Sequence, residues 1–144
     1  MTKLIIGPII EMKMLPKISA PIATFFLRIP LSAMFLQQGL SKLPVTGATA
    51  EAWGLPYIVW WFAAYGELGA GIGLIVAGLL ANWVWLRDYG DLLTRFCGIT
   101  ICSIMTGVIW VGQPESFMDV ILYDNLHVLL WVGGLFFALR GNRT

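Results

Sequence analysis

The stretch that decides the fold is Tyr57 to Asn82, YIVWWFAAYGELGAGIGLIVAGLLAN. It carries one charged side chain, Glu67, and contains no proline. A helix of about 20 apolar residues crosses the ~30 Å hydrocarbon core of a bilayer, where every backbone amide must be bonded within the segment. The stretch therefore predicts a transmembrane helix.

Glu67 falls ~15 Å along this predicted helix, close to the middle of the bilayer. A carboxylate at that depth is costly in lipid, so we expect it to face protein or a water-filled cavity. Small residues, which let neighbouring helices approach closely, lie on the Glu67 side or beside it: Ala63, Ala64, Gly69, Ala70, Gly71, Gly73, Ala77 and Gly78. The helix is therefore expected to be central. A structural charge and a functional carboxylate both remain open for Glu67.

Composition places the chain outside the soluble globular class. Hydrophobic residues make up 58% of its 144 residues, and the mean hydropathy is +0.81. The net charge is +1 and no basic run occurs, which argues against a nucleic-acid partner. Cys97 and Cys102 are five residues apart and do not share a helix face, so buried free thiols are expected rather than a redox pair.

The hydrophobic pattern predicts an all-α integral membrane protein, an antiparallel bundle of four transmembrane helices in a domain over residues 21–144. The spans are expected at about 21–43, 57–82, 92–112 and 120–139, and residues 1–20 are expected to lie on the membrane surface. A signal peptide is disfavoured because Glu11 and Lys13 directly follow the apolar LIIGPII. Most basic residues fall on the side that holds both termini, so both termini are expected in the cytoplasm.

The first predicted span carries both of its cations, Arg28 and Lys42, on one helical stripe. Lys42 lies at the end of the span, where it can reach the interface, whereas Arg28 lies inside the other end and needs a carboxylate, a carbonyl or a lipid phosphate. We expect Arg28 and Glu67 to form a structural charge pair. Pro30 is expected to kink this helix.

The predicted topology gathers polar side chains in the outer half of the bundle. An aspartate and a histidine at i, i+3 can share a proton, and an indole offers a flat surface to a planar ring. This chemistry suits a quinone head group, and the candidate cofactor-binding residues are Gln38, Lys42, Glu67, Asp124, His127 and Trp131. The alternative is that Asp124 and Asn125 only satisfy amides at a helix N-terminus.

Other equipment for chemistry is missing from the sequence. It contains no nucleophile elbow, phosphate loop, dinucleotide fingerprint or metal-binding cluster. His127 is the only histidine, so one chain cannot form a bis-histidine haem site, although a methionine or a partner's ligand leaves haem open. No catalytic residue and no metal ligand is assigned, and we do not expect the chain to be an enzyme on its own.

Three segments resemble the DoxX family. They are LRIPLSAMFLQQGLSKL with Arg28, Gly39 and Lys42, GELGAGIGLIVAGL with Glu67, and YDNLHVLLWVGGLFFALRG near the C-terminus. The resemblance extends from about Ala23 to Gly141, while the family's glycine-rich tail is reduced to GNRT. It implies a four-helix multi-pass protein of the prokaryotic cytoplasmic (inner) membrane.

The resemblance also implies a place in membrane redox complexes, because the family takes its name from a small subunit associated with thiosulfate:quinone oxidoreductase. We therefore expect an accessory or anchoring subunit of an oxidoreductase complex, with the lipid bilayer and other subunits as partners. A non-catalytic structural or assembly subunit is the alternative, since the family also includes assembly factors. A small-molecule carrier is disfavoured because no inverted repeat is visible.

Overall fold

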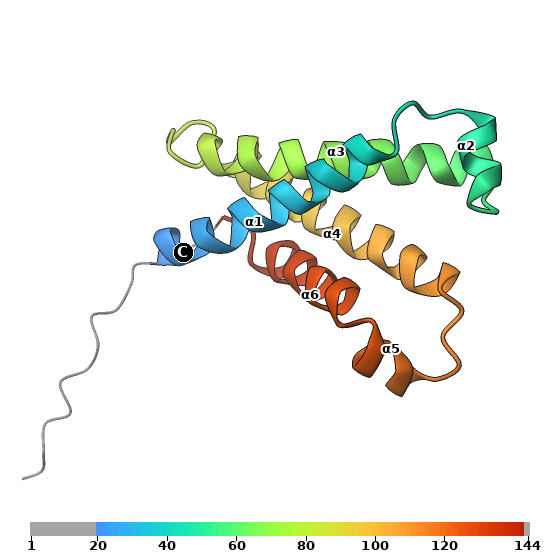
Figure 1. Ribbon diagram of the computed structural model, residues 1–144. Helices are drawn as coiled ribbons and strands as arrows, with labels where there is room; N and C mark the ends of the chain where they lie inside the picture. The colour runs from blue at the N-terminus through green and yellow to red at the C-terminus, as the bar shows by residue number, and fades with distance from the viewer. Residues whose placement is uncertain (1–19, 143–144) are drawn as a thin grey trace, which may run out of the picture.

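The computed structural model describes residues 20–142, and within this range all regular structure is helical (Figure 1). The expected surface segment lies outside the described residues except for Ala20, which begins the first helix. The helices are α1 (Ala20–Ser41), α2 (Gly47–Ala52), α3 (Tyr57–Leu80), α4 (Arg87–Val111), α5 (Phe117–Tyr123) and α6 (Asn125–Arg140). The predicted all-α class is confirmed.

Two of these helices, α3 and α4, are long and apolar enough to cross a membrane. The pair α5 and α6 qualifies as a third span if the bent pair is counted as one. Among the described residues, α1 is not one of the candidate spans. The chain is therefore a helical membrane protein, and a closed antiparallel bundle with both termini in the cytoplasm stays a prediction.

The fourth span was expected to be one helix over 120–139. The structure has two helices there, α5 and α6. Ser116 caps α5 by accepting a hydrogen bond from the Asp119 amide, and the helix ends at Asp124, whose φ of −114° and ψ of 37° are not helical. α6 then leaves at an angle of 96° to α5. The Ser116 cap begins a separate short helix, and the non-helical backbone of Asp124 ends it, although the apolar pattern of the sequence continues across this point.

Two other boundaries differ from the sequence prediction. α4 begins at Arg87 rather than near Leu92, because the polar LRDYG segment continues the helix beyond the apolar core. Asp88 lies in its first turn, where a carboxylate favours the helix N-terminus. The segment predicted as loop between α1 and α3 contains α2, which starts with a capping box between Thr46 and Thr49.

The long helices pack in the order α1, α3, α4, α6, and α1 meets α6 only over a short length. Glycine permits the closest approach. A Cβ on Gly98 of α4 would lie 2.4 Å from the backbone nitrogen of Ala138 in α6, and a Cβ on Gly71 of α3 would lie 3.0 Å from the Ser32 carbonyl in α1. Larger residues at these positions would force the helices apart.

The buried core lies at the end where the helices converge. Leu31 and Phe35 of α1, Leu74 of α3, Ile101 of α4 and Phe137 of α6 belong to it. Toward the other end α3 and the α5–α6 pair diverge (Figure 1). The divergence leaves the space in which the candidate site lies.

Candidate functional site

A large groove opens at the divergent end of the helices. Its volume is about 1850 Å³. Its walls come from the end of α1, the loop after α2, the first half of α3 and α4 from Leu93 onward. One side of α5, the break at Asp124 and the start of α6 complete them. Most of its lining is apolar, so the few polar side chains on it define what it can recognise.

Lys42 and Glu67 form an ion pair on the α1–α3 wall of this groove. The Nζ atom of Lys42 donates to both carboxylate oxygens, at 3.0 Å and 2.7 Å. The Glu67 side chain is 1% exposed and that of Lys42 is 15% exposed. The expectation that Glu67 faces protein is met. Lys42 satisfies the buried carboxylate and remains accessible from the groove.

Two indoles lie beside this ion pair. Trp53 stacks on Trp60 with ring centroids 5.8 Å apart and an interplanar angle of 19°. Lys42 Nζ lies 5.8 Å from the centre of the Trp60 ring. The Trp60 Nε1 atom is buried and has no hydrogen-bond partner among the described residues. Trp53 is largely exposed and offers a flat face at the groove.

Asp124 and His127 line the opposite wall, at the break between α5 and α6. His127 Nδ1 contacts the Asp124 carboxylate, and both side chains are partly exposed. A carboxylate at Nδ1 holds the ring in one orientation and leaves Nε2 for another partner. Such a pair at an open mouth can exchange protons with water.

The other two candidate cofactor-binding residues have separate surroundings. Gln38 lines the groove near Lys42, and its backbone carbonyl accepts from Ser41 and from Lys42. Trp131 is not part of the groove lining, and its Nε1 donates to Thr106 Oγ1 at 3.1 Å. The structure thus gathers Gln38, Lys42, Glu67, Asp124 and His127 on one groove, and it ties Trp131 to α4 instead.

The expected charge pair between Arg28 and Glu67 does not form, because each residue has other partners. Arg28 is buried at the convergent end, where it donates to the Leu74 carbonyl, Thr94 Oγ1 and Asn142 Oδ1. Its guanidinium also lies 4.8 Å from the centre of the Phe137 ring. Lys42, one residue beyond the end of α1, supplies the cation for Glu67 instead.

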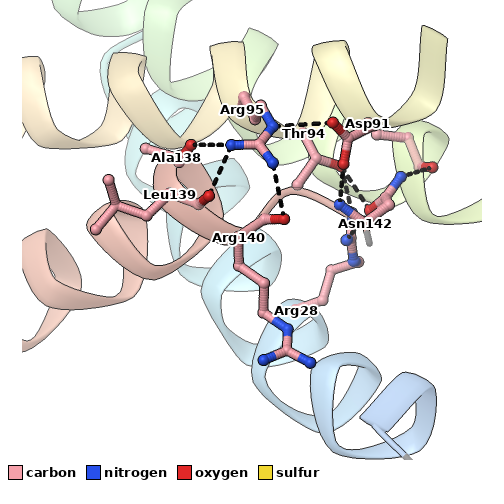
Figure 2. A network of polar contacts seen from close by, with 9 residues as sticks. Arg28, Asp91, Thr94, Arg95, Ala138, Leu139, Arg140 and Asn142 are labelled. Atoms are coloured by element: carbon pink, nitrogen blue, oxygen red, sulfur yellow. Dashed lines mark hydrogen bonds and ion pairs between the residues drawn. The ribbon is translucent and has the colours of Figure 1, made fainter. Parts of the chain in front are cut away.

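Figure 2 shows a polar network around Arg28 that sequence reasoning did not identify. Asn142 joins it through its backbone amide, which donates to Asp91 at 2.7 Å, and through its Nδ2 atom, which donates to the Ala77 carbonyl at 2.8 Å. Asp91 also pairs with Arg95 at 2.9 Å. The i, i+4 spacing of Asp91 and Arg95 is visible in the sequence, whereas Asn142 carries no such signal.

Arg95 extends this network to the C-terminal end of α6. Its guanidinium donates to the carbonyls of Ala138, Leu139 and Arg140 (Figure 2). The last carbonyls of a helix have no amide partner within it. A guanidinium there donates hydrogen bonds to them and interacts favourably with the negative end of the helix dipole. The network therefore fastens α6 to α4 and has a structural character.

Lys42 and Glu67 neutralise each other in the groove wall, and Asp119 and Asp124 add carboxylates at its mouth. A neutral ligand with hydrogen-bond acceptors therefore fits the groove better than an anion. Among residues 20–142 no group of three or more His, Cys, Asp or Glu side chains could hold a metal ion. The arrangement can stack a ring, donate to its oxygens and supply protons.

The helices and the apolar groove define the class of a multi-pass helical membrane protein. The DoxX family model matches residues 23–86, which confirms the resemblance to that family over α1, α2 and α3. The match includes Arg28, Lys42 and Glu67 and ends before α4, so the resemblance of the last helix stays a prediction. Comparison with curated proteins gives no significant match, and neither does comparison with solved structures.

Proposed function

We propose that this DoxX-type protein is an accessory or anchoring subunit of a membrane oxidoreductase complex and contributes a quinone-facing site. The observation that carries the proposal is the apolar groove of about 1850 Å³ with the Lys42–Glu67 pair in its wall. A buried ion pair on a lipid-accessible groove is costly to maintain in a membrane, and such residues commonly mark ligand or proton pathways.

The shape and chemistry of the groove fit the two parts of a quinone. The apolar walls suit a hydrocarbon tail, and the exposed face of Trp53 suits a planar ring. Lys42 makes its longest hydrogen bond, 3.4 Å, to the Gln38 carbonyl, and this donor can turn to a carbonyl oxygen of the ring. The Nε2 atom of His127, in the protonated form of its ring, can donate to a second oxygen. A bound quinone would accept the electrons. Glu67 holds the Lys42 ammonium in place, and Asp124 holds the His127 ring.

Binding to the groove can be measured in the full chain by tryptophan fluorescence. A water-soluble benzoquinone analogue should quench the emission of Trp53, so Trp53→Phe should remove a saturable part of the quenching. Trp85→Phe is the control, because Trp85 is exposed and lies outside the groove lining. Equal quenching in the two variants, or quenching that never saturates, would argue against the site.

The proposed role in the complex needs a separate experiment on the native assembly purified in mild detergent. We expect a redox-active partner and quinone to copurify with the chain, and a chain that runs alone would contradict the proposal. Glu67→Gln and His127→Ala should slow quinone turnover while the complex still assembles. Unchanged kinetics in both would leave these residues a structural role only.

A second candidate function is a non-catalytic structural or assembly subunit. The observation that favours it is the number of large apolar side chains exposed on the helices, which neighbouring subunits as well as lipid can cover. On this view Arg28 and Glu67 hold the helices in the form that the partner recognises. Alanine at either position should then lower the amount of assembled complex, and normal assembly would count against it.

A further inference from the structure

The short helix α5 has an apolar face that nothing in the described chain covers. None of its residues is buried, and among the described helices it packs mainly against α6. The side chains on this face are Phe117, Met118, Ile121 and Leu122, and their exposures are 76%, 56%, 42% and 56%. Their spacing of three and four puts them on one side of the helix.

The other side of α5 faces the groove. Asp119, Val120 and Tyr123 line the groove, whereas Phe117, Met118, Ile121 and Leu122 do not. Ser116 Oγ donates to Asp119 Oδ2 at 2.9 Å, which keeps these polar groups together on the groove side. The polar groups of α5 therefore lie toward the groove mouth, and its wholly apolar face points away from it.

The depth and direction of α5 follow from its neighbours. α4 is a candidate span that ends at Val111, and the exposed Trp110 in its last turn is the type of residue that favours the membrane interface. Only residues 112–116 separate that end from α5. Since α5 is bent 96° from α6, it lies near the membrane plane when α6 runs along the bilayer normal.

We propose that α5 is an in-plane helix docked in the interface of the bilayer, and that its partner is the lipid surface. Phe117, Met118, Ile121 and Leu122 enter the boundary between head groups and acyl chains, as the apolar face of an interfacial helix does. Asp119 and Tyr123 then form a polar edge of the groove mouth. This inference does not depend on the ligand of the groove.

Spin labels on single cysteines in the full chain in vesicles of a zwitterionic phospholipid test the proposal. Labels replace Phe117, Met118, Asp119, Ile121 and Leu122 one at a time in a Cys97→Ala and Cys102→Ala background. Ile72, which is exposed near the middle of α3 and lies outside the groove lining, serves as the reference for a deep lipid-facing site. Relaxation by oxygen and by a water-soluble nickel chelate gives each label's depth, and an unchanged helix content confirms folding.

We expect the four apolar positions to be accessible to oxygen at one shallow depth, and position 119 to be accessible to the nickel chelate. A continuous span would instead place position 121 ~6 Å deeper or shallower than position 117. That gradient would overturn the proposal. Low oxygen accessibility at all four positions would also overturn it, because a second copy or another protein would then cover the face.

Discussion

The ion pair between Lys42 and Glu67 joins α1 to α3 at the groove. Removal of Lys42 would leave a carboxylate that is 1% exposed without its cation. Breaking a buried pair in this way is costly, whereas replacing both partners with apolar residues of similar volume is often neutral. Single and double substitutions at these two positions can therefore separate the contribution of the ion pair to stability from its contribution to binding.

Lys42→Ala should lower the free energy of unfolding by roughly 3 kcal/mol, as expected for a buried charge that loses its partner. The double variant Lys42→Met and Glu67→Met should recover most of that stability yet lose the quinone-analogue quenching. Denaturant titration of the full chain in mixed micelles measures the first effect. A double variant as unstable as Lys42→Ala would contradict the pairing.

Asn142 is the residue through which the C-terminal end bonds to three helices. Its side chain accepts from Arg28 at 2.6 Å and from Thr94 at 2.8 Å, and it donates to the Ala77 carbonyl. Asn142→Ala removes these bonds and should destabilise the chain by about 2 kcal/mol or more. Asn82→Ala changes the same residue type in an exposed turn and should have little effect. Equal stabilities in the two variants would contradict the role of the network.

At the scale of the elements, the contact between α4 and α6 depends on two glycines that face each other. A Cβ on Gly98 would lie 2.6 Å from the Gly134 carbonyl, and a Cβ on Gly134 would lie 3.0 Å from the Gly98 carbonyl. Neither contact can relax through a flexible side chain, since backbone atoms are involved. The two helices can therefore approach this closely only because neither of these two positions carries a side chain.

Gly98→Ala should force α6 away from α4 and destabilise the chain by about 2 kcal/mol, in the range of overpacked cores. Gly107→Ala is the matched control in the same helix, because a Cβ there meets nothing within 4 Å. Alanine favours a helix over glycine, so this control should be neutral or gain up to about 1 kcal/mol. Thermal unfolding of both variants, followed by circular dichroism, distinguishes the outcomes.

The elements also show what the sequence could and could not predict. The apolar run of α3, its buried small residues and the inward position of Glu67 follow from the cost of polar groups in lipid, so the sequence predicts them. The break at Asp124 was missed, because apolar residues continue on both sides of it. The partner of Glu67 depends on how α1 crosses α3, which no local pattern encodes.

At the scale of the whole molecule, the long helices converge at one end and diverge at the other (Figure 1). Arg28 bonds to its neighbours at the convergent end, and the groove lies at the divergent end. The C-terminal end of α6 lies beside the first half of α1, as the bond between Arg28 and Asn142 requires. The Arg28 network fixes one end of the assembly, and the open end is left for a ligand or a lipid. The sequence predicts that Gln38, Lys42, Glu67, Asp124 and His127 lie near one another. It predicts neither the Arg28 network nor the groove between the helices.

The proposed topology places both termini and the connection between α3 and α4 in the cytoplasm, by the distribution of Lys and Arg. Trp85→Cys and Arg140→Cys, each in the Cys97→Ala and Cys102→Ala background, should react with a membrane-impermeant thiol reagent only after the cells are opened. Trp53→Cys should react in intact cells. The reverse pattern, or different behaviour at 85 and 140, would contradict the proposed topology.

The most direct test of the central claim is an image of the native complex in a lipid nanodisc, at a resolution that shows the contents of the groove. We expect a planar head group stacked on Trp53, with an oxygen within hydrogen-bond distance of Lys42 or His127. Acyl chains or a partner's helix filling the groove, with no head group at either residue, would contradict it.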